Sequence, residues 1–381
     1  MFIVFYITVG LLLLYGLLIG YYNYAWKKIP EFSPKNFKGW EGNTKVTVIV
    51  PARDEKDNIL QCLGSLARQT YPAELLEIIV VNDHSTDNTE ELVRNFPAVN
   101  VTLINLSDYT GGMQLNSYKK KAIEVAIAAS SGELIVTTDA DCTSSPDWIR
   151  CLAAYHQLTH AALIVAPVKI ESTSSLLSIF QSVDFLTLQG ITGASVSAKF
   201  HSMCNGANLT YEKKAFYEVE GFKNIDTIAS GDDMLLMHKI VNRYPDRFFF
   251  VKAEAAIVST PPVTSWKAFL QQRIRWASKA DKYNDKRIFG VLLMVYMLNL
   301  LLLLFLIAAL SNISWSFFFL ILLVGKTLLE YSFIRNVAAF FKQGRLMVYF
   351  PFLQPLHILY TVIAGWLGKF GSYEWKSRKV K

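Results

Sequence analysis

Two stretches without any charged residue bracket a mixed central segment, and they limit what this chain can fold into more than any other feature. Residues 2–22 and 288–310 contain no Asp, Glu, Lys or Arg. A run of about 20 apolar residues can cross the hydrocarbon core of a bilayer. Charged residues make up only 18% of the chain, whereas about 25% is usual in soluble proteins. We therefore expect a membrane protein with an N-terminal transmembrane anchor at residues 1–26 and a C-terminal transmembrane region at residues 288–367.

Aromatic and basic residues at the end of the first stretch predict its orientation. Aromatic side chains gather between Tyr21 and Trp26, and Lys27 and Lys28 follow at once. Tyr and Trp favour the membrane–water interface, and lysines favour the cytoplasmic side. We expect residues 45–285 in the cytoplasm, attached to the inner membrane if the protein is bacterial.

The second half of the membrane region is less regular. Residues 313–334 carry Lys326 and Glu330, which are four residues apart and therefore fall on one helical face. The two side chains form either a self-neutralising structural pair or a functional intramembrane pair. Residues 347–367 contain two prolines, and we expect them to be kinked or partly re-entrant. That arrangement would keep the basic tail, residues 368–381, on the cytoplasmic side.

Charge and cysteine content exclude other classes of protein. Lys and Arg exceed Asp and Glu by 38 to 31, a net charge of +7. The basic runs are short, and we expect them to face the membrane rather than a nucleic acid. The four cysteines form no Cys-x-x-Cys pair, so neither a zinc site nor a disulfide framework is expected, and reduced thiols fit the cytoplasm.

The central segment alternates apolar strands with helical stretches. We predict strands in residues 46–50, 77–83, 99–105 and 133–139, and helices in 56–69, 87–95 and 117–130. The first strand is expected to end at Pro51, and Thr86 or Asp87 to cap the second helix. This alternation predicts an α/β fold with a mainly parallel sheet covered on both faces. Ligands of such sheets bind at the carboxyl ends of the strands.

Acidic residues follow the predicted strands at that edge. Asp139 and Asp141 are two residues apart, so both carboxylates can face one divalent cation. Asp83 follows another strand and can accept hydrogen bonds from a ribose or a base. Neither a dinucleotide-binding Gly-x-Gly-x-x-Gly nor a P-loop is present.

Two further segments carry polar groups suited to chemistry. Asp232 and Asp233 open an apolar helix, where a carboxylate either complements the helix dipole or serves as a general base. Arg275 can bind a diphosphate, and Trp276 can stack on a sugar ring. The segment around these last two residues is equally compatible with an amphipathic helix at the membrane interface.

Together these segments resemble the membrane-bound family 2 glycosyltransferases of the cellulose-synthase-like group. The resemblance rests on five motifs in the family's order: Pro51-Ala52-Arg53-Asp54-Glu55, Asn82-Asp83-His84-Ser85-Thr86-Asp87, Asp139-Ala140-Asp141, Gly231-Asp232-Asp233 and Gln272-x-x-Arg275-Trp276. The loop Cys204-Asn205-Gly206-Ala207-Asn208 is similar to the family's acceptor-site loop.

The resemblance implies a GT-A fold, inversion at the anomeric carbon, and Mg²⁺ or Mn²⁺ as cofactor. It also implies a nucleotide-diphosphate sugar as donor, and a UDP-sugar is the first candidate. It implies that Asp233 is the catalytic base, with Asp232 as the alternative, and that Asp139 and Asp141 hold the metal. It assigns donor binding to Pro51, Arg53, Glu55, Asp83, Lys120, Asp139 and Arg275, and acceptor binding to Gly206, Gln272 and Trp276.

Three functions remain open at this point. The first is transfer of one or a few sugars, of the hexosyl or N-acetylhexosaminyl type, to a lipid-linked or saccharide acceptor. The second is processive polysaccharide synthesis, which the Gln-x-x-Arg-Trp motif favours and the few membrane segments disfavour. The third is a membrane scaffold that retains the fold without activity.

Overall fold

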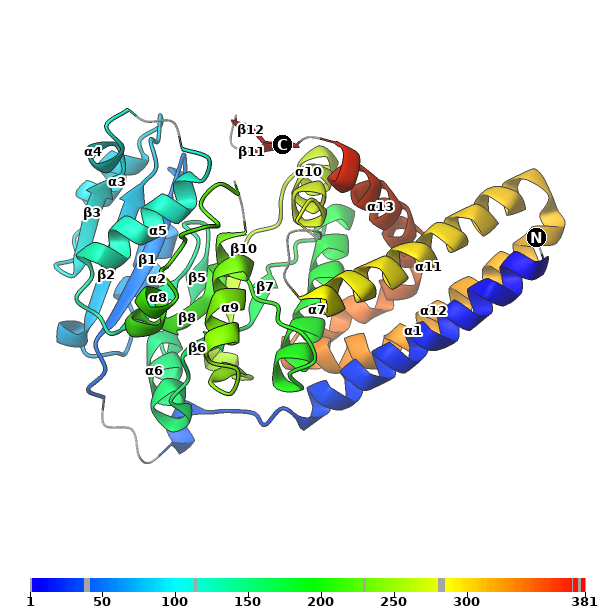
Figure 1. The fold of residues 1–381 in the computed structure, drawn as a ribbon, viewed down its shortest axis with the longest axis horizontal. Coiled ribbons are helices and arrows are strands. Elements are labelled where there is room, and N and C mark those ends of the chain that lie inside the picture. The colour runs from blue at the N-terminus through cyan, green and yellow to red at the C-terminus, as the bar shows by residue number, and fades with distance from the viewer. Residues whose placement is uncertain are drawn as a thin grey trace. The chain divides into compact units, whose positions relative to one another are not determined.

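The computed structural model describes residues 2–37, 42–112, 115–228, 231–279, 285–371, 373–375 and 378–380. The chain packs into two compact units, whose elements are labelled in Figure 1. The sheet unit consists of residues 30–169 and 202–261, and the helical unit of residues 1–29, 170–201 and 262–381. Residues 170–201 interrupt the sheet unit in sequence and pack with the helical unit.

The main sheet of the sheet unit has seven strands among the described residues. Their order is β3 (Val101–Asn105), β2 (Leu76–Asn82), β1 (Val46–Ala52), β4 (Leu134–Thr137), β8 (Leu209–Glu212), β6 (Leu163–Val165) and β9 (Phe248–Phe250). The first four are mutually parallel, whereas β8 is antiparallel to both of its neighbours. The expected mainly parallel sheet is confirmed. Its order reverses at β1, and β4 lies on the other side of that strand.

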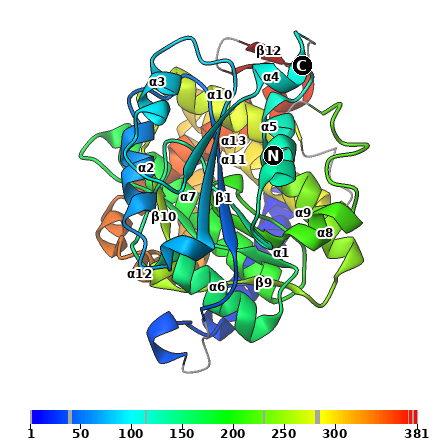
Figure 2. The same cartoon turned by 90° about the vertical axis from the view of Figure 1, so that its left-hand side faces the viewer.

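The central strands are buried on both faces, which explains their unbroken apolar sequences. Val48, Ile49 and Val50 are 0% exposed, and each such side chain contributes about 1.5–3 kcal/mol through burial. In Figure 2, α2 (Ile59–Ala67) and α3 (Thr89–Arg94) lie on one side of β1 and α5 (Tyr118–Ala129) on the other. These helices lie within the predicted helical stretches, so the alternation correctly located them.

The prediction that β1 ends at Pro51 is wrong, and the pairing pattern explains why. β1 continues through Pro51 to Ala52 in register with β2. The Ala52 carbonyl accepts from the Asp83 N–H, and successive strand residues direct their main-chain groups to opposite neighbours. The Pro51 nitrogen therefore faces the β4 side, where pairing already ends at Ile49. No ladder bond is lost there.

The start of α3 also differs from the expected cap. Asn88 occupies the capping position without a side-chain hydrogen bond. The Asp87 carboxylate instead accepts from the N–H of Thr89 at 3.0 Å. Asp87 thus stabilises the first turn from one position further back.

The remaining elements of the sheet unit complete its core. A three-stranded sheet has the order β5 (Thr143–Ser144), β10 (Val258–Thr260) and β7 (Val168–Ile170). The other helices are α4 (Ser107–Thr110), α6 (Trp148–Thr159), α8 (Lys213–Glu218) and α9 (Asp232–Arg243), with single turns η1 (Pro34–Asn36), η2 (Ala73–Leu75), η3 (Gly206–Asn208) and η4 (Glu254–Ala256).

The helical unit contains α1 (Phe2–Lys28), α7 (Leu176–Ser197), α10 (Trp266–Ala277), α11 (Lys286–Ser311), α12 (Ser316–Phe340) and α13 (Phe350–Phe370), with η5 (Ile313–Trp315), η6 (Gly344–Val348) and a hairpin of β11 (Tyr373–Trp375) and β12 (Arg378–Val380). Among the described residues, α1, α11, α12 together with η5, and α13 are long and apolar enough to span a membrane. Helices α1, α11 and α12 pack side by side (Figure 1). Residues 350–370, which include Pro355, form one continuous helix.

A buried polar network joins the transmembrane helices. Lys326 and Glu330 of α12 form an ion pair at 2.8 Å. The Gln354 side chain of α13 accepts from Lys326 at 2.7 Å and donates to Glu330 at 2.6 Å. The Tyr15 hydroxyl of α1 donates to the other Glu330 oxygen. Because each group has a protein partner, the network supports the structural interpretation of the Lys326–Glu330 pair.

Candidate active site

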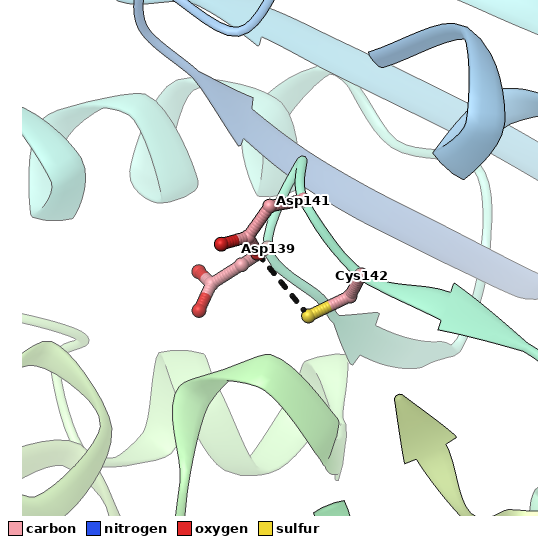
Figure 3. Close-up of side chains that lie close together, drawn as sticks. All are labelled: Asp139, Asp141 and Cys142. Carbon is pink, nitrogen blue, oxygen red and sulfur yellow. Dashed lines mark hydrogen bonds between the residues drawn. The ribbon is translucent and has the colours of Figure 1, made fainter. Parts of the chain in front are cut away.

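The paired carboxylates lie directly after β4. Figure 3 shows Asp139 and Asp141 on the turn that follows the strand, beside Cys142. One ligand atom from each of these side chains lies within 4.8 Å of the others. Because β1 and β4 flank the point where the strand order reverses, this turn lies where open α/β sheets bind ligands.

The donor atoms at this turn suit a hard divalent cation. Two carboxylates supply oxygen ligands, which Mg²⁺ and Mn²⁺ prefer. The Cys142 thiol is buried and donates to Asp141 Oδ1 at 3.4 Å, and burial raises its pKa well above the ordinary value. The oxygen atoms of Asp139 and Asp141 are therefore the ligands that fit such an ion.

A lysine that the sequence interpretation passed over connects the two groups of acids. Lys119, at the start of α5, donates to Asp139 Oδ1 at 2.7 Å and lies 3.5 Å from Asp232 Oδ2. Burial alone would lower the pKa of this ammonium, but Asp139 and Asp232 hold its pKa above the ordinary value. Lys119 therefore keeps its positive charge at neutral pH, between two carboxylates.

Lys120, the lysine expected to bind the donor, points elsewhere. Its side chain is 2% exposed, and its ammonium donates to the carbonyls of Ile225 and Ile228 at 2.6 Å each. In the structure Lys119, rather than Lys120, accompanies the acids.

Asp232 and Asp233 begin α9, as predicted, and Gly206 contacts them. The Gly206 N–H donates to Asp233 Oδ2 at 2.9 Å, and the Met234 N–H donates to Asp233 Oδ1 at 2.7 Å. A β-carbon at Gly206 would lie 3.3 Å from the Asp233 β-carbon and 3.5 Å from Asp232 Oδ2. The absence of a side chain at Gly206 therefore permits this close approach.

Gly231 forms the turn from which α9 begins, and it therefore determines where the Asp232 and Asp233 side chains lie. It occupies the capping position of α9 with φ of +77°, a left-handed conformation that glycine adopts readily. Ser230, the residue before it, lies outside the described residues. The turn at Gly231 starts the helix so that the first two residues, Asp232 and Asp233, face Lys119 and Gly206.

The Gly206 loop is held by a second set of contacts that sequence patterns did not indicate. Asn208 is fully buried and donates to the carbonyls of Pro167 and Ala256, while its Oδ1 accepts from Trp148. Thr137, the last residue of β4, donates to the Gly206 carbonyl at 2.9 Å. The loop is thus tied to β4, the strand that Asp139 and Asp141 follow.

Polar residues after β1 and β2 hold each other in place. The Arg53 guanidinium donates to the Asp83 carbonyl at 2.9 Å, and the Asp83 carboxylate pairs with the His84 ring at 3.0 Å. Asp54 and His84 both have positive φ angles, a strain that is found preferentially at functional sites. Asp83 lies at the carboxyl edge of the sheet, where the sequence placed it.

Pro51 and Glu55 are the two remaining residues on this edge that the sequence assigned to donor binding. Pro51 lies within β1. Glu55 begins the turn into α2, where its carboxylate accepts from Asn58 at 2.9 Å. These contacts shape the loop after β1.

Gln272, Arg275 and Trp276 belong to α10 of the helical unit. The Gln272 carboxamide accepts from Arg273 at 2.7 Å, and the Trp276 ring is tilted against Phe185 with centroids 6.2 Å apart. All three side chains are partly exposed.

Comparison with known families settles the class of this chain. The family model described as Glycosyl transferase family group 2 matches residues 134–365, more than half of the chain, and the model described as Glycosyl transferase family 2 matches residues 47–218. The chain belongs to glycosyl transferase family 2. The resemblance carried by the five motifs is therefore confirmed.

Individual glycosyltransferases agree with this membership. The probable glycosyltransferase YdaM of Bacillus subtilis (strain 168) is 28% identical over 256 residues, which are 64% of this chain and 58% of that protein. The chain thus spans less than two thirds of that relative. The poly-beta-1,6-N-acetyl-D-glucosamine synthase of Staphylococcus epidermidis is 22% identical over 318 residues, 81% of this chain and 73% of that protein.

A solved structure confirms the fold. The mannosyltransferase PcManGT from Pyrobaculum calidifontis, solved with GDP-Man and Mn²⁺, covers 97% of both chains with a TM-score of 0.56 and 18% sequence identity. The chain accordingly has the GT-A fold expected from its motifs.

Proposed function

We propose that this chain is an inverting, membrane-bound glycosyltransferase that uses a nucleotide-diphosphate sugar and a lipid-linked or saccharide acceptor. One observation carries the proposal. At the point where the strand order reverses, Lys119 lies 2.7 Å from Asp139 and 3.5 Å from Asp232, and Asp233 lies next to Asp232. Lys119 thus connects the acids that we propose to bind the metal with the acids that include the proposed base.

The geometry favours Asp233 over Asp232 as the base. The Lys119 ammonium already faces the Asp232 carboxylate. Asp233 instead accepts one main-chain N–H at each oxygen, and each oxygen retains another lone pair for a substrate hydroxyl. The two N–H groups orient the carboxylate without supplying a competing positive charge.

In the proposed reaction, Asp233 accepts the proton of the acceptor hydroxyl while that oxygen bonds to the anomeric carbon. The bond from this carbon to the β-phosphate oxygen breaks on the opposite face, and the nucleoside diphosphate leaves with the electron pair. A divalent cation bound by Asp139 and Asp141 would neutralise charge on the diphosphate. Lys119 adds positive charge beside these acids, and Asp83 accepts hydrogen bonds from the nucleoside. The family resemblance is the ground for proposing Arg275 as a further diphosphate-binding residue.

The relatives suggest which donor to examine first. Proteins named N-acetylglucosaminyltransferase, from Sinorhizobium fredii and Rhizobium meliloti, are 28% and 26% identical to this chain. We propose an N-acetylhexosaminyl or hexosyl donor carried on UDP, and UDP-N-acetylglucosamine is the first candidate.

Processive synthesis is the second candidate function. The Gln272, Arg275 and Trp276 set of α10 favours it, and the Staphylococcus relative is named a synthase. The four candidate spans among the described residues leave little material for a polysaccharide channel within one chain, so we place single or limited transfer first.

One experiment addresses both functions. Purified protein in lipid nanodiscs is incubated with a panel of nucleotide sugars and a lipid extract, and released nucleoside diphosphate and product length are measured. We expect release with a UDP-sugar, loss of activity in excess chelator, and short products on lipid. A long polymer would favour the synthase, and no release with any donor would overturn the proposal.

A further inference from the structure

A buried ion pair links α10 to α7 within the helical unit. Arg273 Nε and Nη2 lie 3.0 and 2.7 Å from Asp184 Oδ2. The side chains are only 4% and 3% exposed. Burying two charges is expensive unless further hydrogen bonds satisfy them.

Helix α13 holds the other carboxylate oxygen. The Tyr360 hydroxyl donates to Asp184 Oδ1, and His357 Nε2 lies 3.9 Å from the same oxygen. The Asp184 carboxylate is therefore contacted from α10 and α13 while its own backbone belongs to α7. Asp184 has little freedom to move, and Arg273 is anchored through it.

The Arg273 guanidinium also contacts two residues of the Gln-x-x-Arg-Trp motif. Arg273 Nη1 donates to Gln272 Oε1 at 2.7 Å. Its guanidinium carbon lies 4.3 Å from the centroid of the Trp276 ring, a cation–π contact. Since a guanidinium only donates hydrogen bonds, the Gln272 oxygen is the atom that faces Arg273. The amide N–H₂ is the group of Gln272 that can donate to another partner.

We propose that Arg273, anchored by Asp184, is a positioning residue that orients Gln272 and Trp276 for the acceptor. The inference rests on the proposed function, because it takes these two residues as part of the acceptor site. It adds that Gln272 acts as a hydrogen-bond donor there. The ligand group it meets is consequently an acceptor, such as a sugar hydroxyl or ring oxygen.

The test compares Arg273→Lys with wild type in nanodiscs. Lysine keeps the charge but cannot serve Asp184, Gln272 and the Trp276 ring together. We expect kcat/KM for the acceptor to fall by about 10–100-fold, the range for a misplaced binding group. KM for the donor and hydrolysis of the donor by water should stay within twofold. Lys267→Met, an exposed residue of the same helix, is the control and should leave all values unchanged.

A double-variant comparison separates positioning from general stability. If Arg273 acts through the tryptophan, Arg273→Lys should add much less acceptor loss to Trp276→Ala than it causes alone. Additive losses, an unchanged acceptor KM in Arg273→Lys, or equal losses of donor and acceptor use would each overturn the inference. Thermal unfolding of every variant identifies those that do not fold, and Tyr360→Phe, which removes one Asp184 contact, supplies a milder second variant.

Tryptophan emission, which needs no turnover, tests the Arg273 inference separately from the proposed function. Arg273→Lys should alter tryptophan emission in the parent protein and leave it unaltered in a Trp276→Phe background. An unaltered emission in both would contradict the contact itself. Wild-type protein that consumes no donor would instead overturn the proposed function, and the acceptor assignment with it.

Discussion

At the residue scale, Gly206 packs closely against the two acids that begin α9. A β-carbon there would lie within 3.3 Å of Asp233 and 3.5 Å of Asp232. Gly206→Ala should therefore shift Asp233 by a few tenths of an ångström and lower kcat by roughly tenfold, because reacting groups tolerate little displacement. Gly290→Ala in α11, where a β-carbon meets nothing within 4 Å, is the control. Equal kcat values for the two variants would show that the Gly206 contact does not matter for turnover.

The two neighbouring acids should respond differently to amide substitution. Asp233→Asn keeps the side-chain volume but cannot take a proton, so turnover should fall by about 10²–10⁴, with donor affinity nearly unchanged. Asp232→Asn should have a smaller effect, since a charge at a helix start is typically worth about 0.3–1 kcal/mol. Steady-state kinetics and nucleotide titrations measure both. If Asp232→Asn is the crippled variant, the base has been assigned to the wrong neighbour.

Metal binding should depend on the acids after β4. Asp141→Ala removes one of the two proposed oxygen ligands, so we expect titration of Mn²⁺, followed by its electron paramagnetic resonance signal, to show about tenfold weaker binding or more. Asp108→Ala, which removes an acid of α4, should bind Mn²⁺ like wild type. Unchanged binding by Asp141→Ala would exclude that carboxylate as a ligand.

Whether the sequence predicts that two site residues lie together depends on how far apart they are in the chain and on which element they occupy. Asp139 and Asp141 were predicted to be close because they follow one strand, and they are close. Lys119 and Lys120 are adjacent on a helix and therefore point in directions about 100° apart. The sequence alone could not say which faced the acids. The contacts of Asn208 were equally hidden, because its partners Trp148, Pro167 and Ala256 lie far from it in the chain.

At the element scale, the strands β1 to β4 and the helices α2, α3 and α5 were predicted, because unbroken apolar runs alternate with helical stretches in that part of the chain. β8 was not predicted as a member of the sheet, although it lies between β4 and β6. It contains four residues, Leu209–Glu212, and such a short run has no clear period. Pro51 is likewise tolerated inside β1 because the pairing of β1 with β4 has already ended at Ile49. The proline itself does not reveal where that pairing ends.

The polar network between α1, α12 and α13 permits a prediction about stability. Lys326→Met would leave the Glu330 carboxylate buried without its ammonium, and breaking a buried pair costs about 3–5 kcal/mol. The double variant Lys326→Met, Glu330→Gln removes both charges and should be less destabilised than Lys326→Met alone. Unfolding in detergent, followed by circular dichroism, measures both. A double variant as unstable as the single one would show that the charges do not determine the cost.

At the scale of the whole molecule, the four apolar helices indicate association with a membrane. Cysteine labelling can test on which side of that membrane the sheet unit lies. The native thiols are poor reporters, because Cys62, Cys142 and Cys151 are buried. Burial raises the pKa of Cys151 to about 12, so its thiol stays protonated and unreactive at neutral pH.

An exposed cysteine avoids this difficulty. Val99 of the sheet unit and Ile313 between α11 and α12 are both largely exposed. In a Cys204→Ser background, Val99→Cys should resist a membrane-impermeant maleimide in intact cells and react after permeabilisation. Ile313→Cys should react in intact cells, because α11 starts on the cytoplasmic side in this topology. Labelling of Val99→Cys in intact cells would reverse the assigned orientation.

The place of β8 between β4 and β6 has a consequence for synthesis on the ribosome. β4 ends at Thr137, but β8 begins at Leu209, after the whole of α7 has been made. At about 5–20 residues per second, the edge of β4 stays unpaired for several seconds. An unpaired strand edge is a template for pairing with other chains. Nascent chains stalled within α7 should therefore be more prone to aggregation than chains stalled after Glu212.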